Sequence, residues 1–168
     1  MKIFISYRRK DSGREVGRIR DRLKAEFGEQ SVFRDLMDIP SGVDFRTILD
    51  RETKSCDVML VIIGPLWAGI ADEEGNKRLF KAGDFTRIEV ETGLERLEKG
   101  TIRVFPVLVQ NAAMPSAAEL PSSLSQLHNQ NAISIHDDPY FDFDMNRLIG
   151  DIKKTGFHRL AKLADFEP

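Results

Sequence analysis

The sequence predicts an α/β fold in which helices cover both faces of a parallel sheet. Segments typical of strands alternate with segments typical of helices along most of the 168 residues. Two strand candidates, DVMLVII (57–63) and RVFPVLV (103–109), are almost continuously apolar. Such runs are typical of parallel strands that are buried on both faces. Alternation with helices also requires crossover connections, which are right-handed and make neighbouring strands parallel.

Five strands are expected. The first is KIFIS (2–6), in which a lysine leads into branched apolar residues. The others are expected at 31–33, 57–63, 103–109 and 132–135. Pro106 interrupts the fourth strand, and because proline cannot donate a hydrogen bond to a neighbouring strand, it indicates an irregular or edge position.

The helices follow from apolar residues spaced three and four apart. In 14–27 this spacing is made by Val16, Ile19, Leu23 and Phe27. Further helices are expected at 45–54, 84–98, about 117–128 and 142–154, and Asp84 is the expected N-cap of the third. Residues 1–154 are thus expected to form one domain, with 155–168 as a tail or a linker to a further domain.

The composition is that of a soluble globular protein. Hydrophobic residues make up 41% of the chain and charged residues 31%. The net charge of −2 argues against general nucleic-acid binding, which needs a basic face. The chain lacks an apolar run near the ~20 residues of a membrane span, and Met1 leads directly into a strand with no room for a signal peptide. The single Cys56 fits a reducing compartment as a buried structural thiol, so a cytoplasmic location is expected.

A ligand site is expected at the carboxyl edge of the sheet. The element order fits a flavodoxin-like sheet with strand order 2-1-3-4-5, whose switch point lies between the first and third strands. Ligands of open α/β sheets bind there. The loops after Ser6, after Ile63 and before Glu89 should therefore surround one crevice. The first strand runs into Arg8 and Arg9, which give this crevice a positively charged mouth.

Without further information, each candidate residue also has an ordinary structural interpretation. Glu89 would be a solvated helix residue, and Arg8 and Arg9 would be surface charges. Trp67 would pack at the end of a strand, and Phe85 is as consistent with core packing as with stacking on a ligand ring. The chain has neither GxGxxG nor GxxxxGK[ST], which excludes the two common phosphate-binding loops. Its three histidines lack metal-ligand spacing, so no metal site is expected.

Five segments, taken in order, resemble those of bacterial Toll/interleukin-1 receptor (TIR) domains of the NAD-cleaving branch. They are FISYRRKD (4–11), VFRDLMDIPSGVDF (32–45), SCDVMLVIIGPLW (55–67), DFTRIEVETGLER (84–96) and VFPVLV (104–109). A single segment would be unspecific, but five at family-like spacing are not. The resemblance covers about residues 2–152.

The resemblance implies a flavodoxin-like fold and a catalytic glutamate. Enzymes of the family carry this glutamate in a W-x-x-x-E pattern at the start of the third helix, which corresponds here to Glu89. The tryptophan position is Phe85, which keeps an aromatic face, loses the indole N–H and leaves the product open. The resemblance also implies substrate contacts from Tyr7, Arg8, Arg9, Trp67 and Phe85, and from Asp38, Pro40 and Gly42 of the loop 35–44.

The implied activity is cleavage of the nicotinamide–ribose bond of NAD+, which serves as substrate, with no cofactor. The products would be nicotinamide and ADP-ribose or a cyclic isomer. The resemblance further implies activation by TIR–TIR self-association, a sensor domain or partner protein, and a role in bacterial antiphage or stress defence, without nucleic-acid or membrane partners. The alternative is a non-catalytic TIR scaffold that acts through homotypic contacts.

Overall fold

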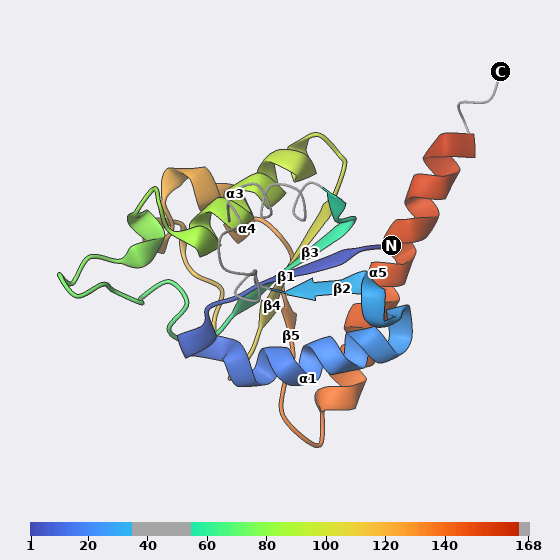
Figure 1. The fold of residues 1–168 in the computed structure, drawn as a ribbon, viewed down its shortest axis with the longest axis horizontal. Coiled ribbons are helices and arrows are strands. Elements are labelled where there is room, and N and C mark those ends of the chain that lie inside the picture. The colour runs from blue at the N-terminus through green and yellow to red at the C-terminus, as the bar shows by residue number, and fades with distance from the viewer. Residues whose placement is uncertain (35–54, 165–168) are drawn as a thin grey trace, which may run out of the picture.

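The computed structural model describes residues 1–34 and 55–164. It contains a five-stranded sheet with the order β2-β1-β3-β4-β5 (Figure 1). All four strand pairs are parallel. The strands are β1 (Ile3–Ser6), β2 (Val32–Arg34), β3 (Val58–Ile63), β4 (Arg103–Leu108) and β5 (Ile133–Ser134). The predicted fold class and strand order are confirmed.

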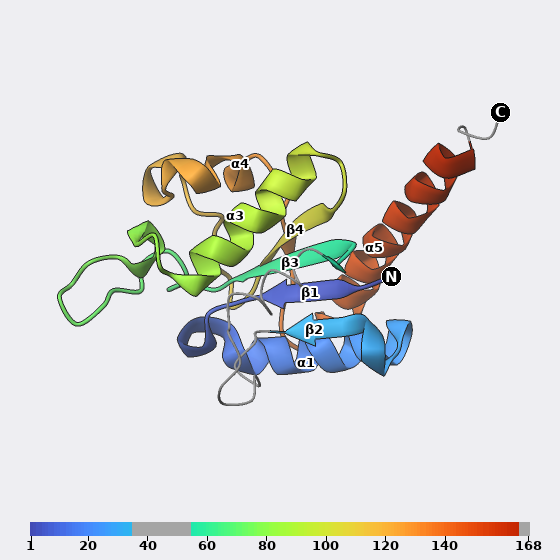
Figure 2. The ribbon, with the colours of Figure 1, turned by 45° about the horizontal axis from the view of Figure 1, so that its top comes forward.

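Helices cover both faces of the sheet (Figure 2). Helices α1 (Arg9–Phe27) and α5 (Phe141–Ala164) both contribute buried apolar residues to one core, which we call the α1-side core. Helices α3 (Phe85–Glu98) and α4 (Ser125–His128) pack in the other, the α3-side core. Short 3₁₀ turns complete the connections: η1 (Glu29–Ser31), η3 (Arg78–Phe80), η4 (Ala117–Glu119) and η5 (Ser122–Leu124).

The central strands are buried on both faces because their side chains alternate between the two cores. In β1, Ile3 and Ile5 belong to the α1-side core, whereas Phe4 belongs to the α3-side core. All six residues of β3 are buried. The same alternation continues beyond β1, where Tyr7 joins the α1-side core. Successive side chains of an extended chain point to opposite faces, so the residues on either side of Tyr7 face α3.

Three helices differ in length from the prediction. The helix expected at about 117–128 is α-helical only in α4, and two 3₁₀ turns, η4 and η5, precede it. Helix α1 starts at Arg9 rather than at 14, and it is kinked at Ser12, whose φ and ψ are −135° and 17°. Residues 9–13 carry no apolar periodicity, so the pattern does not reveal this first turn. Helix α5 continues to Ala164, ten residues beyond the expected end at 154. The helix expected at 45–54 lies outside the described residues.

Pro106 lies in β4, which is an internal strand of the sheet. The N–H group of Arg103 donates to the oxygen of Asp57, just before β3, and that of Val109 donates to the oxygen of Ile63, the last residue of β3. Because successive N–H groups of a strand point to opposite sides, the nitrogen of Pro106 points toward β5. Strand β5 pairs only with Val107 and Leu108. Pro106 thus removes no hydrogen bond to β3, because its nitrogen faces β5. The missing N–H falls on the side where the partner strand is short.

Candidate functional site

The carboxyl of Glu89 lies at the carboxyl end of β1, between this strand and α3. Ser6, the last residue of β1, donates a hydrogen bond from Oγ to Oε2 of Glu89 at 2.6 Å. Both side chains are buried, and Glu89 is only 2% exposed. This location is at the switch point of the sheet, where the sequence predicts a ligand site. The amphipathic pattern alone would have put Glu89 on a solvated helix face.

The guanidinium of Arg8 is buried and hydrogen-bonded within the protein. Its Nε donates to the backbone oxygen of Trp67 at 2.9 Å. Its Nη1 and Nη2 donate to Oδ2 and Oδ1 of Asp84 at 3.1 and 2.9 Å. Two parallel charge-assisted bonds of this kind are strong and fix the orientation of both groups. Arg8 therefore ties the exit of β1 to the loop after β3 and to the start of α3.

Asp84 has two roles at the start of α3. It is the N-cap, since its Oδ1 accepts the backbone N–H of Arg87 at 3.0 Å. This confirms the predicted cap. The same carboxylate accepts the fork of Arg8, and Nε of Arg78 lies 3.4 Å from its Oδ2. The pairing with Arg8 could not be predicted from spacing, because the two residues are 76 positions apart.

Asp11 is a second buried carboxyl at this edge of the sheet, and the predicted site did not include it. Its Oδ2 accepts the backbone N–H of Gly64 at 2.9 Å, and its Oδ1 accepts that of Leu66 at 2.7 Å. Burial raises the pKa of Asp11, against the opposing effect of these two hydrogen bonds and of Arg8. Its backbone oxygen also accepts Nε2 of Gln110 at 2.8 Å. Asp11 thus joins the loops that follow β1, β3 and β4.

The other predicted contacts divide into buried and exposed residues. Tyr7 is buried in the α1-side core, and Trp67 is fully buried in the α3-side core, as its packing interpretation expects. Arg9 is exposed at the start of α1, and Phe85 is 47% exposed at the start of α3. The predicted residues Asp38, Pro40 and Gly42 lie outside the described residues.

Cys56 is a structural thiol, as expected. It is 1% exposed, and burial raises its pKa to about 11, so the thiol remains protonated at neutral pH. Nη1 of Arg96 lies 3.5 Å from its sulfur. Among the side chains that the structure describes, in residues 1–34 and 55–155, no group of histidine, cysteine or carboxylate residues is arranged to hold a metal ion. No helix in the described part of the chain is both long and apolar enough to cross a membrane.

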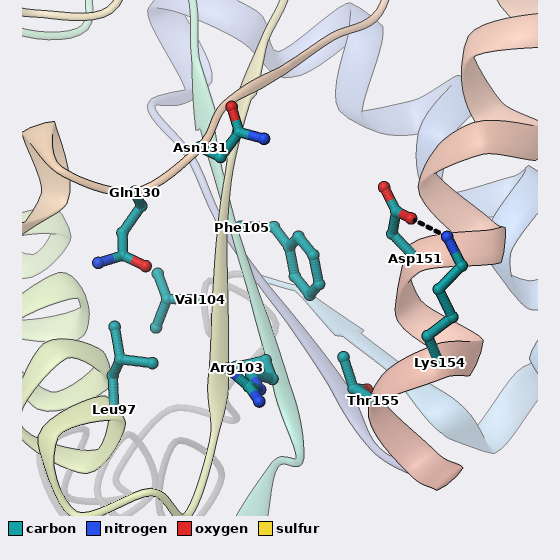
Figure 3. A pocket seen from close by; sticks show the side chains of 9 residues that line it. All are labelled: Leu97, Arg103, Val104, Phe105, Gln130, Asn131, Asp151, Lys154 and Thr155. Carbon is teal, nitrogen blue, oxygen red and sulfur yellow. Dashed lines mark hydrogen bonds and ion pairs between the residues drawn. The ribbon is translucent and has the colours of Figure 1, made fainter. Parts of the chain in front are cut away.

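A pocket of about 280 Å³ lies at the opposite edge of the sheet (Figure 3). Its walls are Leu97 at the end of α3, Arg103 to Phe105 at the start of β4, and Asp151 and Lys154 on α5. The last two form an ion pair at 2.9 Å. Because this pocket is at the amino ends of the strands, it is separate from Glu89 and contains none of the predicted site residues.

Comparison with known proteins agrees with the fold and the order of the segments. The family model described as the TIR domain matches residues 3–149. Among solved structures, the TIR domains of the activated Roq1 resistosome, which directly recognises the pathogen effector XopQ, have the same fold at 15% sequence identity. The TM-score is 0.63, and the match covers 90% of this chain and 98% of that one. No curated protein matches the sequence. Since the family model covers most of the chain, the protein belongs to the TIR domain family.

Proposed function

We propose that this TIR domain cleaves the nicotinamide–ribose bond of NAD+. The observation that carries the proposal is the place of Glu89, whose carboxyl lies at the switch point of the sheet and is hydrogen-bonded to Ser6 at the end of β1. Ligands of open α/β sheets bind at this point. The products are nicotinamide and ADP-ribose or a cyclic isomer, and the setting is cytoplasmic bacterial antiphage or stress defence.

In the proposed reaction, a carboxylate near the reacting carbon contributes more to catalysis than a group that donates a proton. Nicotinamide leaves as a neutral group and needs no proton. The main contribution to the activation free energy is therefore the positive charge that develops on the ribose. A carboxylate near the anomeric carbon stabilises this oxocarbenium-like charge, as in glycosidases. Glu89 supplies that group. The low exposure around it limits competition from water and strengthens the electrostatic interaction.

Exposed residues at the rim would contact the rest of the substrate. Arg9 provides forked donors for the pyrophosphate. Phe85 lies one helical turn before Glu89, and its accessible ring can stack on nicotinamide or adenine. Tyr7 and Trp67 support the site from the two cores, and the loop with Asp38, Pro40 and Gly42 is proposed to complete it.

Activation by self-association is part of the proposal. Glu89 is 2% exposed in the single chain, so NAD+ reaches it only when neighbouring side chains move. Contacts between TIR domains would supply the free energy for this rearrangement. A separate sensor domain or partner protein would set when these contacts form.

The test is nicotinamide release by the wild type and by Glu89→Gln at high protein concentration. We expect the variant to lose at least about a hundredfold in rate, because removal of one electrostatic contact to the transition state typically costs ~10²–10³. Glu95→Gln, which changes an exposed carboxylate on the same helix, is the matched control and should retain the rate. A folded Glu89→Gln protein with wild-type activity would disprove the assignment.

The second candidate is a non-catalytic scaffold that acts through homotypic TIR contacts. Phe85 in place of the family tryptophan and the burial of Glu89 favour it. The same assay separates the two functions. A scaffold assembles at high concentration without releasing nicotinamide, whereas an enzyme releases nicotinamide under the same conditions.

A further inference from the structure

We infer that Arg8 and Asp84 form a positioning pair, which sets where the carboxyl of Glu89 lies, and that Arg8 does not itself contact the substrate. The inference rests on the proposed catalytic role of Glu89. It starts from two side-chain contacts between the same two elements, the exit of β1 and the start of α3.

The two contacts are spaced so that they hold α3 in one register against β1. Ser6 and Arg8 both face α3, because Tyr7 between them is in the opposite core. Ser6 bonds to Glu89, and Arg8 bonds to Asp84. Two residues of extended chain span about 6.6 Å. The five residues from Asp84 to Glu89 span about 7.5 Å of helix. The near match allows both contacts to form together.

The pair is built to fix an orientation. The guanidinium is planar, and its two Nη atoms meet both oxygens of Asp84. This geometry holds only for one position of the helix start, whereas a lysine ammonium accepts many. The third donor, Nε, binds the backbone oxygen of Trp67 and fixes the guanidinium from the other side. The side chains of Arg8 and Asp84 are 4% and 2% exposed, so water does not compete with the contact.

Burial also distinguishes the role of Arg8 from that of Arg9, the next residue in the chain. A phosphate would have to displace Asp84 from the fork of Arg8 and uncover a buried charge, which is costly. Arg9 is exposed and requires no such exchange. The two consecutive arginines therefore have different roles: Arg8 supports the geometry of Glu89, and Arg9 is available to the substrate.

The experiment compares Arg8→Lys and Asp84→Asn with Arg9→Lys. Arg8→Lys keeps the charge and loses the fork. Asp84→Asn loses the ion pair but keeps an N-cap, because asparagine caps helices as well as aspartate. The first readout is amide hydrogen exchange of Arg87 to Glu89, measured on the free protein. We expect roughly tenfold faster exchange in the first two variants, through local opening of the helix start, and no change in Arg9→Lys.

The second readout is the kinetics of nicotinamide release. Loss of positioning predicts a lower kcat for Arg8→Lys and Asp84→Asn at a nearly unchanged KM, whereas Arg9→Lys raises KM. A raised KM with unchanged kcat in Arg8→Lys, or unchanged exchange in both variants, would overturn the inference. If the wild type releases no nicotinamide, the proposed function fails, and the exchange measurement still decides whether the pair positions α3. Should one variant not fold, the other supplies the same comparison.

Discussion

The carboxylate of Asp11 occupies the space that a side chain at Gly64 would need. Oδ2 of Asp11 accepts the backbone N–H of Gly64 at 2.9 Å, and a Cβ atom at position 64 would lie 2.6 Å from the same oxygen. All three carboxyl atoms of Asp11 lie within 2.7 Å of that Cβ position. The close approach therefore depends on glycine at the carboxyl end of β3, next to the candidate site.

Gly64→Ala is expected to destabilise the protein by about 1–3 kcal/mol, the usual cost of overpacking a buried site. The added methyl would push away the Asp11 carboxyl, which is held by two backbone N–H groups. Urea denaturation of both proteins measures the change in the free energy of unfolding. Gly69→Ala in the same loop is the control, since the nearest atom to its Cβ lies at an ordinary 3.8 Å. Equal stability of Gly64→Ala and the wild type would contradict this packing.

Because of the pair of His136 and Asp144, the stability of the protein should fall at acid pH. Burial alone would raise the pKa of Asp144, but hydrogen bonds from the backbone N–H and the imidazole of His136 outweigh it and lower this pKa below 3.8. A carboxyl with a lowered folded-state pKa contributes stability above its unfolded pKa, and this contribution is lost as pH falls through the folded value. Asp144→Asn should therefore cost about 2 kcal/mol at pH 7, the scale of a charge-assisted hydrogen bond.

The check is urea denaturation of the wild type and Asp144→Asn at several pH values. The difference between them should be present above about pH 4 and should shrink as the pH falls further. Asp142→Asn, at an exposed position of the same helix, is the control. A difference that stays the same down to pH 2 would show that the effect comes from shape and not from charge.

Specific activity is expected to rise with protein concentration. In the single chain Glu89 is nearly inaccessible, and the proposed rearrangement needs a second TIR domain. Nicotinamide release measured over a hundredfold range of protein concentration, with and without a fused multimerising domain, tests this. Constant specific activity across the range would indicate a constitutive monomeric enzyme and would remove self-association from the proposal.

The sheet could be predicted because the residue patterns that indicate its strands lie within short stretches of sequence. The apolar run that became β3 and the capping aspartate at position 84 are each visible within a few residues, and both are confirmed. Alternation with helices predicted parallel strands, and the strand order was taken from the flavodoxin-like fold that the elements fit. The first turn of α1 lacks such a signal, and its start was misplaced by five residues because Asp11 holds it through contacts with a distant loop.

Glu89 lies at the edge of the sheet where the sequence predicts a ligand site, but the contacts around it could not be predicted. Tyr7, Arg8 and Arg9 are consecutive, yet the first is in a core, the second is in a buried ion pair and the third is exposed. Their environments differ because successive side chains of an extended chain point to opposite faces, and because the start of α3 places a carboxylate beside only one of them. Asp84, which is far away in sequence, decides the role of Arg8. Pairings of this kind depend on the packed positions of whole elements.

Phe85 is expected to influence which product forms more than whether the protein folds. Its ring is 47% exposed, so Phe85→Ala gives up about half of the burial of a core phenylalanine and should lower the free energy of unfolding by only about 1 kcal/mol. The same variant should slow nicotinamide release, because the ring one helical turn before Glu89 would no longer hold a base near the reacting ribose. Phe85→Trp should keep or raise the rate and change the ratio of cyclic to linear ADP-ribose, measured by chromatography.

The matched control for Phe85 is Phe80→Ala. Phe80 is also 47% exposed but lies in η3, before the start of α3. Loss of this ring should alter neither the rate nor the product ratio, which separates a specific contact from a general loss of surface hydrophobicity. If Phe85→Ala and Phe80→Ala both match the wild type in rate and products, the ring at position 85 does not border the reacting ribose. The base of NAD+ would then have to be held by another part of the site.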